Sequence, residues 1–194
     1  MAHLVFEPGR FAGISEPQTL RYRFETHGRG VEEAKPSPGV LQIREVNPDG
    51  SKKVWLDLFE GSAKRSVGPF EARDQNPLLL VFLQMDVTEM SRLTSGASNY
   101  FQQQIRKKFN DMVPTETVEV EVGGQPVPAT RITLRPFQGD PRIDQFPAFR
   151  DKSYEITVAD SVPGGLWSIV TRTPDPNTGE LILEKSMTFE GVER

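Results

Sequence analysis

The chain has no cysteine among its 194 residues, and this absence removes several kinds of chemistry at once. Without thiols there are no disulfides, no thiolate–zinc sites and no cysteine nucleophile. Histidine is nearly absent as well: His3 lies in the amino-terminal tail, and His27 lies beside Gly28 in a polar stretch. Because an isolated histidine in a polar segment is typical of a solvated side chain, neither residue indicates a base or a metal ligand.

An excess of positive charge is also absent, with 23 Lys and Arg against 27 Asp and Glu and a formal net charge of −4 at pH 7. Non-specific nucleic-acid binding needs a basic face, so we expect no nucleic acid as a partner. No apolar run has the length of a membrane span, and the first residues do not have the pattern of a signal peptide. Because Met1-Ala2-His3 has the form of an expression start, we expect that a signal peptide has been removed.

The longest segment with helical character lies at 76–112, and we expect it to be the centre of the fold. Asn76 is a favourable N-cap, and Pro77 suits the first helical position because its missing N–H costs nothing there. The apolar run 78–83 follows with no polar face. A helix that is apolar all round must be covered on several sides, so this turn is predicted to be buried.

A second helix is predicted after the polar break at 94–96. Ser98 is expected to cap it, and Phe101, Ile105 and Phe109 recur every four residues on one face. The two helices therefore present apolar faces to a common partner, and Gly96 between them is expected to let them swing as a lid.

The rest of the chain consists of short alternating strands and turns, expected as two meanders at 20–67 and 118–190, after an irregular segment at 1–18. Strands joined by turns pair antiparallel, and an antiparallel sheet with one apolar face must bury that face. The predicted fold class is therefore α+β: a single domain, 1–194, with a curved antiparallel half-barrel of about eight or nine strands wrapped around the central helix pair.

Two strand hairpins give predictions at the level of single residues. In the first hairpin, at 40–59, Val54, Leu56 and Leu58 of the second strand are expected on the packed face, and Trp55 and Phe59 on the opposite face. This follows from the period of two in an extended strand.

The second hairpin turns at two consecutive glycines. Its solvent-facing side is expected to set Glu119 and Glu121 against Arg131 and Arg135, because opposite charges on facing positions stabilise a pair of strands.

Chemical motifs are weak throughout the sequence. Asp86 and Glu89 are three residues apart on one helical face and could pair as acid and base or bind a hard cation. A solvated helix face, or an ion pair with Arg92, accounts for them equally well. No phosphate-binding loop and no nucleophile elbow is present, so the sequence predicts neither an enzyme nor a cofactor.

The order of these elements resembles a known family. Asn76-Pro77-Leu78-Leu79-Leu80 after a strand meander is similar to the periplasmic lipoprotein carriers of the LolA and LolB superfamily. NPLLLVFLQMDV, NYFQQQIR and Val162-Pro163-Gly164-Gly165 are also similar to uncharacterised secreted proteobacterial proteins. The resemblance implies a half-barrel whose open side is plugged by helices, and an apolar cavity for acyl chains. Carriers of that type usually begin with a helix, whereas 1–18 here is irregular.

Two functions follow as expectations. The first is a periplasmic binding or carrier protein for a lipid or other apolar ligand, held between the concave sheet face and the helices, with an envelope protein and peripheral membrane contact as further partners. The expected lining residues are Leu79, Phe82, Met90, Phe101, Ile105 and Phe109. The alternative is a non-enzymatic structural or protein-interaction module of the bacterial envelope with a filled core.

Overall fold

A computed structural model of the chain describes residues 10–29, 35–95, 97–111 and 113–193. Its strands form one antiparallel sheet in the order β4-β3-β2-β1-β9-β8-β7-β6-β5. The strands are β1 (Gln18–Gly28), β2 (Ser37–Val46), β3 (Lys52–Leu58), β4 (Arg65–Ala72), β5 (Thr115–Val122), β6 (Gln125–Leu134), β7 (Ser153–Val158), β8 (Leu166–Pro174) and β9 (Leu181–Glu193). The predicted α+β class and the predicted strand number are confirmed.

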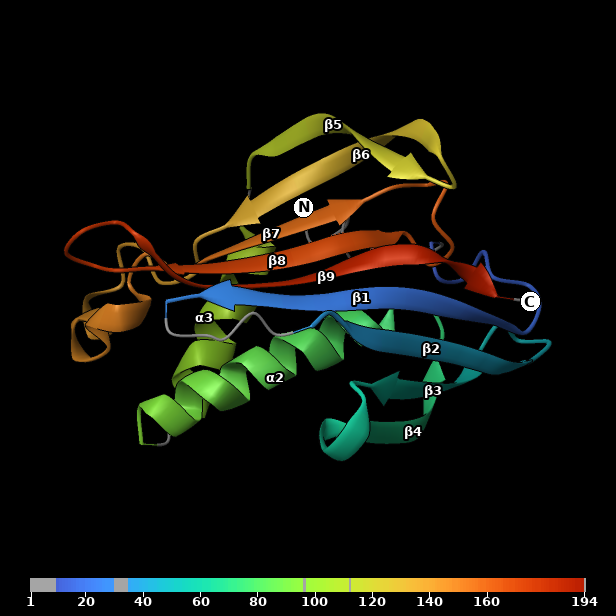
Figure 1. Cartoon of the computed structure of the whole chain (residues 1–194), viewed down its shortest axis with the longest axis horizontal. Helices are drawn as coiled ribbons and strands as arrows, with labels where there is room; N and C mark the ends of the chain where they lie inside the picture. The colour runs from blue at the N-terminus through green and yellow to red at the C-terminus, as the bar shows by residue number, and fades with distance from the viewer. Residues whose placement is uncertain (1–9, 30–34, 96, 112, 194) are drawn as a thin grey trace.

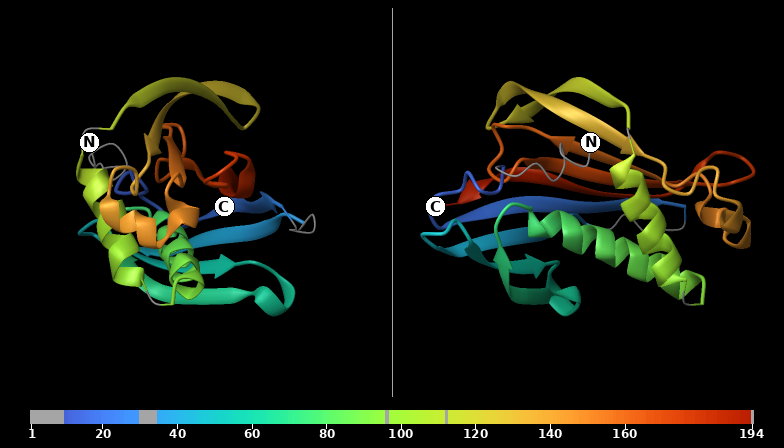
Figure 2. Two further views of the ribbon diagram at one scale, coloured as in Figure 1. Left: turned by 90° about the vertical axis from the view of Figure 1, so that its left-hand side faces the viewer. Right: turned by 180° about the vertical axis from the view of Figure 1, so that it is seen from behind.

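The sheet is curved, and both helices lie on its concave side (Figures 1 and 2). They are α2 (Pro77–Leu93) and α3 (Ser98–Asn110). Because β4 and β5 are the two edge strands, the helix pair carries the chain across the open side of the half-barrel from one edge to the other.

The junction between the helices differs from the prediction. Ala97 precedes α3 and makes no side-chain capping hydrogen bond, so the predicted capping by Ser98 is wrong. Gly96, the predicted hinge, lies outside the described residues.

The two meanders are joined where the first strand of the sheet pairs with the last. β1 and β9 run antiparallel, with Tyr22 opposite Phe189 and Phe24 opposite Met187. All four side chains are buried, so the centre of the concave face is built from both ends of the described chain. Sequence patterns identified the strands of each meander, but this pairing joins strands far apart in the chain.

The helix α2 is held on the sheet by the apolar run that was predicted to be buried. Leu78, Leu79 and Phe82 are buried, and the Phe82 ring stacks on the Phe24 ring of β1 with centroids 5.8 Å apart. Leu80 is the exception: it is 44% exposed, because the sheet and α3 cover the helix on two sides only. The prediction that this run is buried therefore fails at Leu80.

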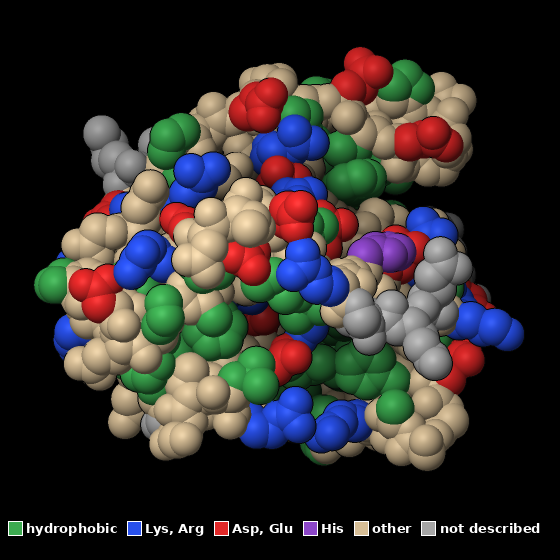
Figure 3. Space-filling model, turned by 60° about the vertical axis from the view of Figure 1, so that its left-hand side comes forward, with side chains coloured by type: hydrophobic (Ala, Val, Ile, Leu, Met, Phe, Trp, Pro, Cys, Tyr) green, Lys and Arg blue, Asp and Glu red, His purple; other side chains and the backbone are tan. Residues whose placement is uncertain are grey.

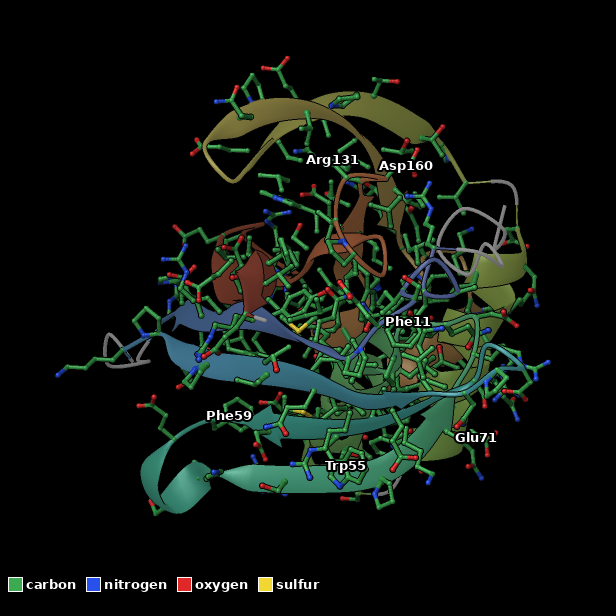
Figure 4. The ribbon with its side chains drawn as sticks, turned by 90° about the vertical axis from the view of Figure 1, so that its right-hand side faces the viewer. Phe11, Trp55, Phe59, Glu71, Arg131 and Asp160 are labelled. Atoms are coloured by element: carbon green, nitrogen blue, oxygen red, sulfur yellow. The ribbon has the colours of Figure 1, made fainter. Side chains whose placement is uncertain are left out.

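One end of the half-barrel is closed by the segment that precedes β1. Residues 10–17 contain no helix or strand, as predicted for this part of 1–18; residues 1–9 lie outside the described residues. Phe11 is fully buried within the curve of the sheet (Figure 4). Beside it the Asn76 side chain accepts a hydrogen bond from the Leu78 amide at 3.0 Å and donates one to the Tyr22 hydroxyl at 3.3 Å. The N-cap of α2 thus also ties the helix to β1.

Phe59 departs from the predicted alternation. The three aliphatic residues of β3 are buried as predicted, and Trp55 lies on the opposite face, where the Arg44 guanidinium covers its ring at 4.4 Å. Phe59, however, has a φ of 62° and follows the end of β3. This left-handed backbone turns its ring to the concave side, 5.3 Å from the Phe24 ring centroid. The period of two stops where the extended strand stops.

The predicted pairing of Glu119 and Glu121 with Arg131 and Arg135 is also wrong. In the β5–β6 register both glutamates lie opposite prolines, and Arg131 lies opposite Glu116, with its Nη1 3.5 Å from the carboxylate. The cause is the turn, which uses only the two glycines, so that β6 begins directly after them and includes both prolines. Prolines are tolerated here because this part of β6 extends beyond β7.

Replacing Asn76 by Ala should weaken the attachment of α2 to the sheet. The variant loses the N-cap and the donor to Tyr22, so we expect the free energy of unfolding to fall by about 1–2 kcal/mol. Urea denaturation measures this change. The control is Asn110→Ala at the exposed end of α3, which should stay within about 0.5 kcal/mol of the parent protein. Equal losses in the two variants would contradict the role given to Asn76.

Candidate functional site

The end of the molecule opposite Phe11 is open. Here the last turns of α2 face the connection between β6 and β7 and the hairpin between β8 and β9 (Figure 1). Figure 3 looks onto this end, where hydrophobic side chains surround a hollow with charged side chains at its margin. Because the helix covers only part of the concave face, space remains on both of its sides.

The larger cavity lies between the carboxyl-terminal half of α2, the 3-10 helices of the β6–β7 connection and β9, and has a volume of about 550 Å³. The 3-10 helices span Pro141–Gln145 and Pro147–Phe149. Most of the lining is apolar: Met90, Leu93, Phe146, Pro147, Ala148, Phe149, Ile182 and Leu183. Leu93, at the rim, is 63% exposed. Apolar side chains at the rim and along the walls favour an apolar guest.

A smaller cavity of about 230 Å³ lies on the other side of α2, against β1 and the end of β3. Phe24, Phe59, Phe82 and Met85 form its apolar walls. Phe59 reaches this cavity only because its left-handed backbone turns it inward. The two cavities have Asp86 and Glu89 in common, so they adjoin at these two carboxylates of α2.

Asp86 belongs to a buried ion pair. Its Oδ1 lies 3.1 Å from the Lys152 Nζ, and the two side chains are 4% and 3% exposed. Its Oδ2 accepts a hydrogen bond of 2.6 Å from the Tyr154 hydroxyl, and Lys152 also donates to the Thr173 hydroxyl at 3.1 Å. Burial raises the pKa of Tyr154 well above its ordinary value, and the Asp86 charge adds to this effect. Every member has a partner, so the network is suited to holding α2 in place.

Glu89, one turn further along α2, forms an ion pair with Lys185 of β9. These side chains are 30% and 24% exposed, so the pair is reached by solvent from the cavities. Burial lowers the pKa of Lys185, while the charge of Asp86 acts in the opposite direction. The pair therefore places a charge-bearing, accessible group at the junction of two apolar cavities.

The interpretation of Asp86 and Glu89 as a solvated helix face, or as partners of Arg92, is wrong. Asp86 lies four residues after Phe82 and four before Met90, so the helical period places it on the buried face. This spacing was a usable signal. The partners Lys152, directly before β7, and Lys185, in β9, were missed, because nothing in the local sequence distinguishes them from exposed lysines.

Of the six residues predicted to line a cavity, four lie at three different spaces and two lie at none of them. Phe82 lines the smaller cavity and Met90 the larger one. Ile105 and Phe109 line a groove of about 350 Å³ between α2 and α3, which also involves the exposed Leu80. The other two, Leu79 and Phe101, are buried and line none of these three spaces.

Phe101 is the centre of an aromatic cluster. Its ring centroid lies 5.3–5.5 Å from those of Tyr100, Phe137, Phe146 and Phe149. Edge-to-face contacts of this kind stabilise a packed core beyond the area they bury. The cluster forms a solid wall behind the larger cavity, since Phe146 and Phe149 belong to both.

Neither a metal-holding group nor a membrane-spanning helix is present in the described residues. No group of three or more Asp, Glu or His in this part of the chain is arranged to hold a metal ion. In the same part, no helix combines the length and the hydropathy that crossing a bilayer requires. What the geometry offers is an α+β half-barrel with two apolar cavities that meet at an ion pair.

Comparison with known proteins gives distant likenesses only. No family model and no curated protein sequence matches the chain. Among solved structures it is similar to the Mycobacterium tuberculosis lipoprotein LppX, with 8% identity and a TM-score of 0.35 over 89% of this chain and 84% of that one. It is also similar to LprF from Mycobacterium bovis, with 8% identity and a TM-score of 0.31 over 98% of this chain and 92% of that one. A third similar structure is a LolA superfamily protein from Nitrosomonas europaea, of the family that the sequence pattern resembles. It has 9% identity and a TM-score of 0.25 over 99% of this chain and 92% of that one. At this distance the likenesses establish no ligand for this chain.

Breaking the buried ion pair from one side should destabilise the protein strongly. Lys152→Met leaves the Asp86 carboxylate buried without its cation, at a cost of about 3–5 kcal/mol in the free energy of unfolding. Adding Asp86→Asn to this variant removes the buried charge and keeps an acceptor for the Tyr154 hydroxyl. The free energy of unfolding of the double variant should therefore fall by less than that of Lys152→Met alone.

Chemical denaturation of the single and double variants measures the difference. Lys64→Met, at an exposed position, serves as the control and should be nearly neutral. A double variant that is less stable than Lys152→Met would show that the pair is not coupled as described.

The tyrosines should remain protonated until the protein unfolds in alkali. The chain has three, and the pKa values of Tyr22, Tyr100 and Tyr154 are all raised, mainly by burial. Unfolded tyrosines ionise near pH 10. Above this pH the folded state holds more protons than the unfolded state, so the free energy of unfolding falls as the pH rises. Below this pH the tyrosines are protonated in both states, and their contribution to stability is fully present. We expect tyrosinate absorbance to rise together with the loss of circular dichroism. Ionisation of the tyrosines with a midpoint near pH 10 and unchanged dichroism would contradict this burial.

Proposed function

We propose that the chain binds a lipid or a similar apolar ligand and carries it in the bacterial periplasm. The observation that supports this most is the larger cavity, whose volume of about 550 Å³ falls in the range of roughly 300–1,000 Å³ typical of small-molecule sites. Its walls are mainly apolar, and it opens at the end of the half-barrel that is not closed by Phe11. Phe82 and Met90 are the predicted site residues that we assign to ligand contact.

Burial of the chain of an amphiphile would supply the affinity. Each methylene group removed from water contributes about 0.8 kcal/mol, so a dozen carbons provide ample binding energy even after the entropy of ordering the chain. Leu79 and Phe101 lie behind the walls, and a ligand could reach them only by displacing packed neighbours. Ile105 and Phe109 face a separate groove, which we propose as a second apolar contact surface.

Exposed apolar side chains gather near the same opening. Leu93, at the end of α2, is 63% exposed, and Leu181, at the start of β9, is 45% exposed. Side chains of this kind beside a cavity would meet the apolar region of a membrane while a ligand enters or leaves. We therefore propose peripheral membrane contact at this end and assign no chemical reaction to the protein.

The alternative is a structural or protein-interaction module of the bacterial envelope. The aromatic cluster around Phe101 favours it, because this part of the interior is filled and tightly packed. Such a module would bind an envelope protein instead of a lipid. Affinity capture from an envelope extract, together with a failure to bind lipid probes, would support this alternative.

Binding of a fluorescent fatty acid tests the carrier proposal. Delipidated protein should bind cis-parinaric acid with micromolar affinity, measured by the increase in probe fluorescence. Leu93→Glu places a charge at the rim of the larger cavity and should weaken binding at least tenfold, or about 1.4 kcal/mol. Val67→Glu on the edge strand β4 is a matched control, because Val67 is an exposed apolar residue that lines neither cavity nor the groove, and it should leave the affinity unchanged within twofold. Absence of binding to the parent protein would overturn the proposal.

A further inference from the structure

The two cavities beside α2 form a pair with a shared polar junction. Asp86 and Glu89 line both cavities, and every other lining residue belongs to one of them alone. The apolar walls therefore diverge from the helix to its two sides, one set toward Ile182 and Leu183, the other toward Phe24 and Phe59. A single straight chain can follow only one of these directions.

The two carboxylates at the junction differ in what they can offer a ligand. Both Asp86 oxygens are engaged, one by Lys152 and one by Tyr154, inside a network that is almost fully buried. Glu89 and its partner Lys185 are about a quarter to a third exposed, and Lys185 lines the smaller cavity. The Glu89–Lys185 pair is thus the accessible charged pair at the junction: Lys185 donates hydrogen bonds and Glu89 accepts them.

The sizes of the two cavities also indicate that they hold different parts of one molecule. The larger one, about 550 Å³, has the size of a complete ligand site, whereas the smaller one, about 230 Å³, falls below the roughly 300 Å³ at which such sites begin. The smaller cavity is therefore suited to one arm of a molecule whose remainder lies elsewhere.

We propose that the ligand is an amphiphile with two apolar chains, one in each cavity, and that its polar linkage binds at the Glu89–Lys185 pair. This inference rests on the proposed function and specifies its ligand class. The two chains leave the linkage in different directions, and α2 lies between them. A linkage with hydroxyl or ester groups meets both a donor and an acceptor at the junction.

The experiment compares two ligands that share a linkage and differ by one chain: 1-octanoylglycerol and 1,2-dioctanoylglycerol, each competing with cis-parinaric acid. We expect dioctanoylglycerol to bind at least 30-fold more tightly to the parent protein. Met85→Trp fills the smaller cavity and should reduce this advantage to less than threefold while leaving octanoylglycerol unchanged. Met85→Ala, which enlarges the same cavity, should keep the advantage, and it provides the comparison if the Trp variant fails to fold.

The outcomes separate the two proposals. Equal affinity for the two glycerides, or an unchanged advantage in a folded Met85→Trp protein, would overturn the two-chain inference and leave the carrier proposal intact. Loss of the advantage in Met85→Trp alone would support the inference. If neither glyceride nor the fatty-acid probe binds to the parent protein, the proposed function fails and the inference fails with it.

Discussion

The contact between α2 and the concave face of the sheet is the constraint on which the rest of the structure depends. Leu78, Leu79, Phe82 and Met90 are buried along the helix, and each contributes roughly 1.5–3 kcal/mol by leaving water. The sheet cannot bury its own concave face, because it is open and its two edge strands are far apart in its order. The helix supplies the missing cover, and its position decides where cavities remain.

Charge burial beside this helix requires an explanation, because an ion pair taken out of water recovers its desolvation cost only with good geometry and further hydrogen bonds. Asp86 and Lys152 meet these conditions through Tyr154 and Thr173. The network joins α2 to strands β7 and β8 at the open end, as Asn76 joins it to β1 at the closed end. The helix is thus fixed by polar contacts at its amino-terminal end and near its middle, and by apolar packing along its length.

Much of the fold could be predicted from the sequence because local periodicity reports which face of an element is apolar. The alternation of Leu20, Tyr22 and Phe24 identified β1, and the apolar run after Asn76 identified α2. Predictions that depended on a turn were less successful. Phe59 was misplaced because a positive φ ends the alternation, and Arg131 was misplaced because the two-glycine turn fixes a different register.

The candidate site was only partly within reach of sequence reasoning. Phe82 and Met90 lie beside the two cavities, and Asp86, four residues from each of them, lies on the same buried face of α2. Lys152 and Lys185 could not be found from the sequence, because their burial depends on which distant segments pack over them.

The sequence by itself determined the strands, the two helices and the absence of thiol chemistry, since these follow from composition and from periods of two and 3.6 residues. Only the tertiary structure decided that β1 pairs with β9, that Glu89 meets Lys185 and that two cavities flank one helix. The physical reason is distance along the chain: such contacts are made between segments whose local patterns carry no record of each other, and the packing of the whole fold selects them.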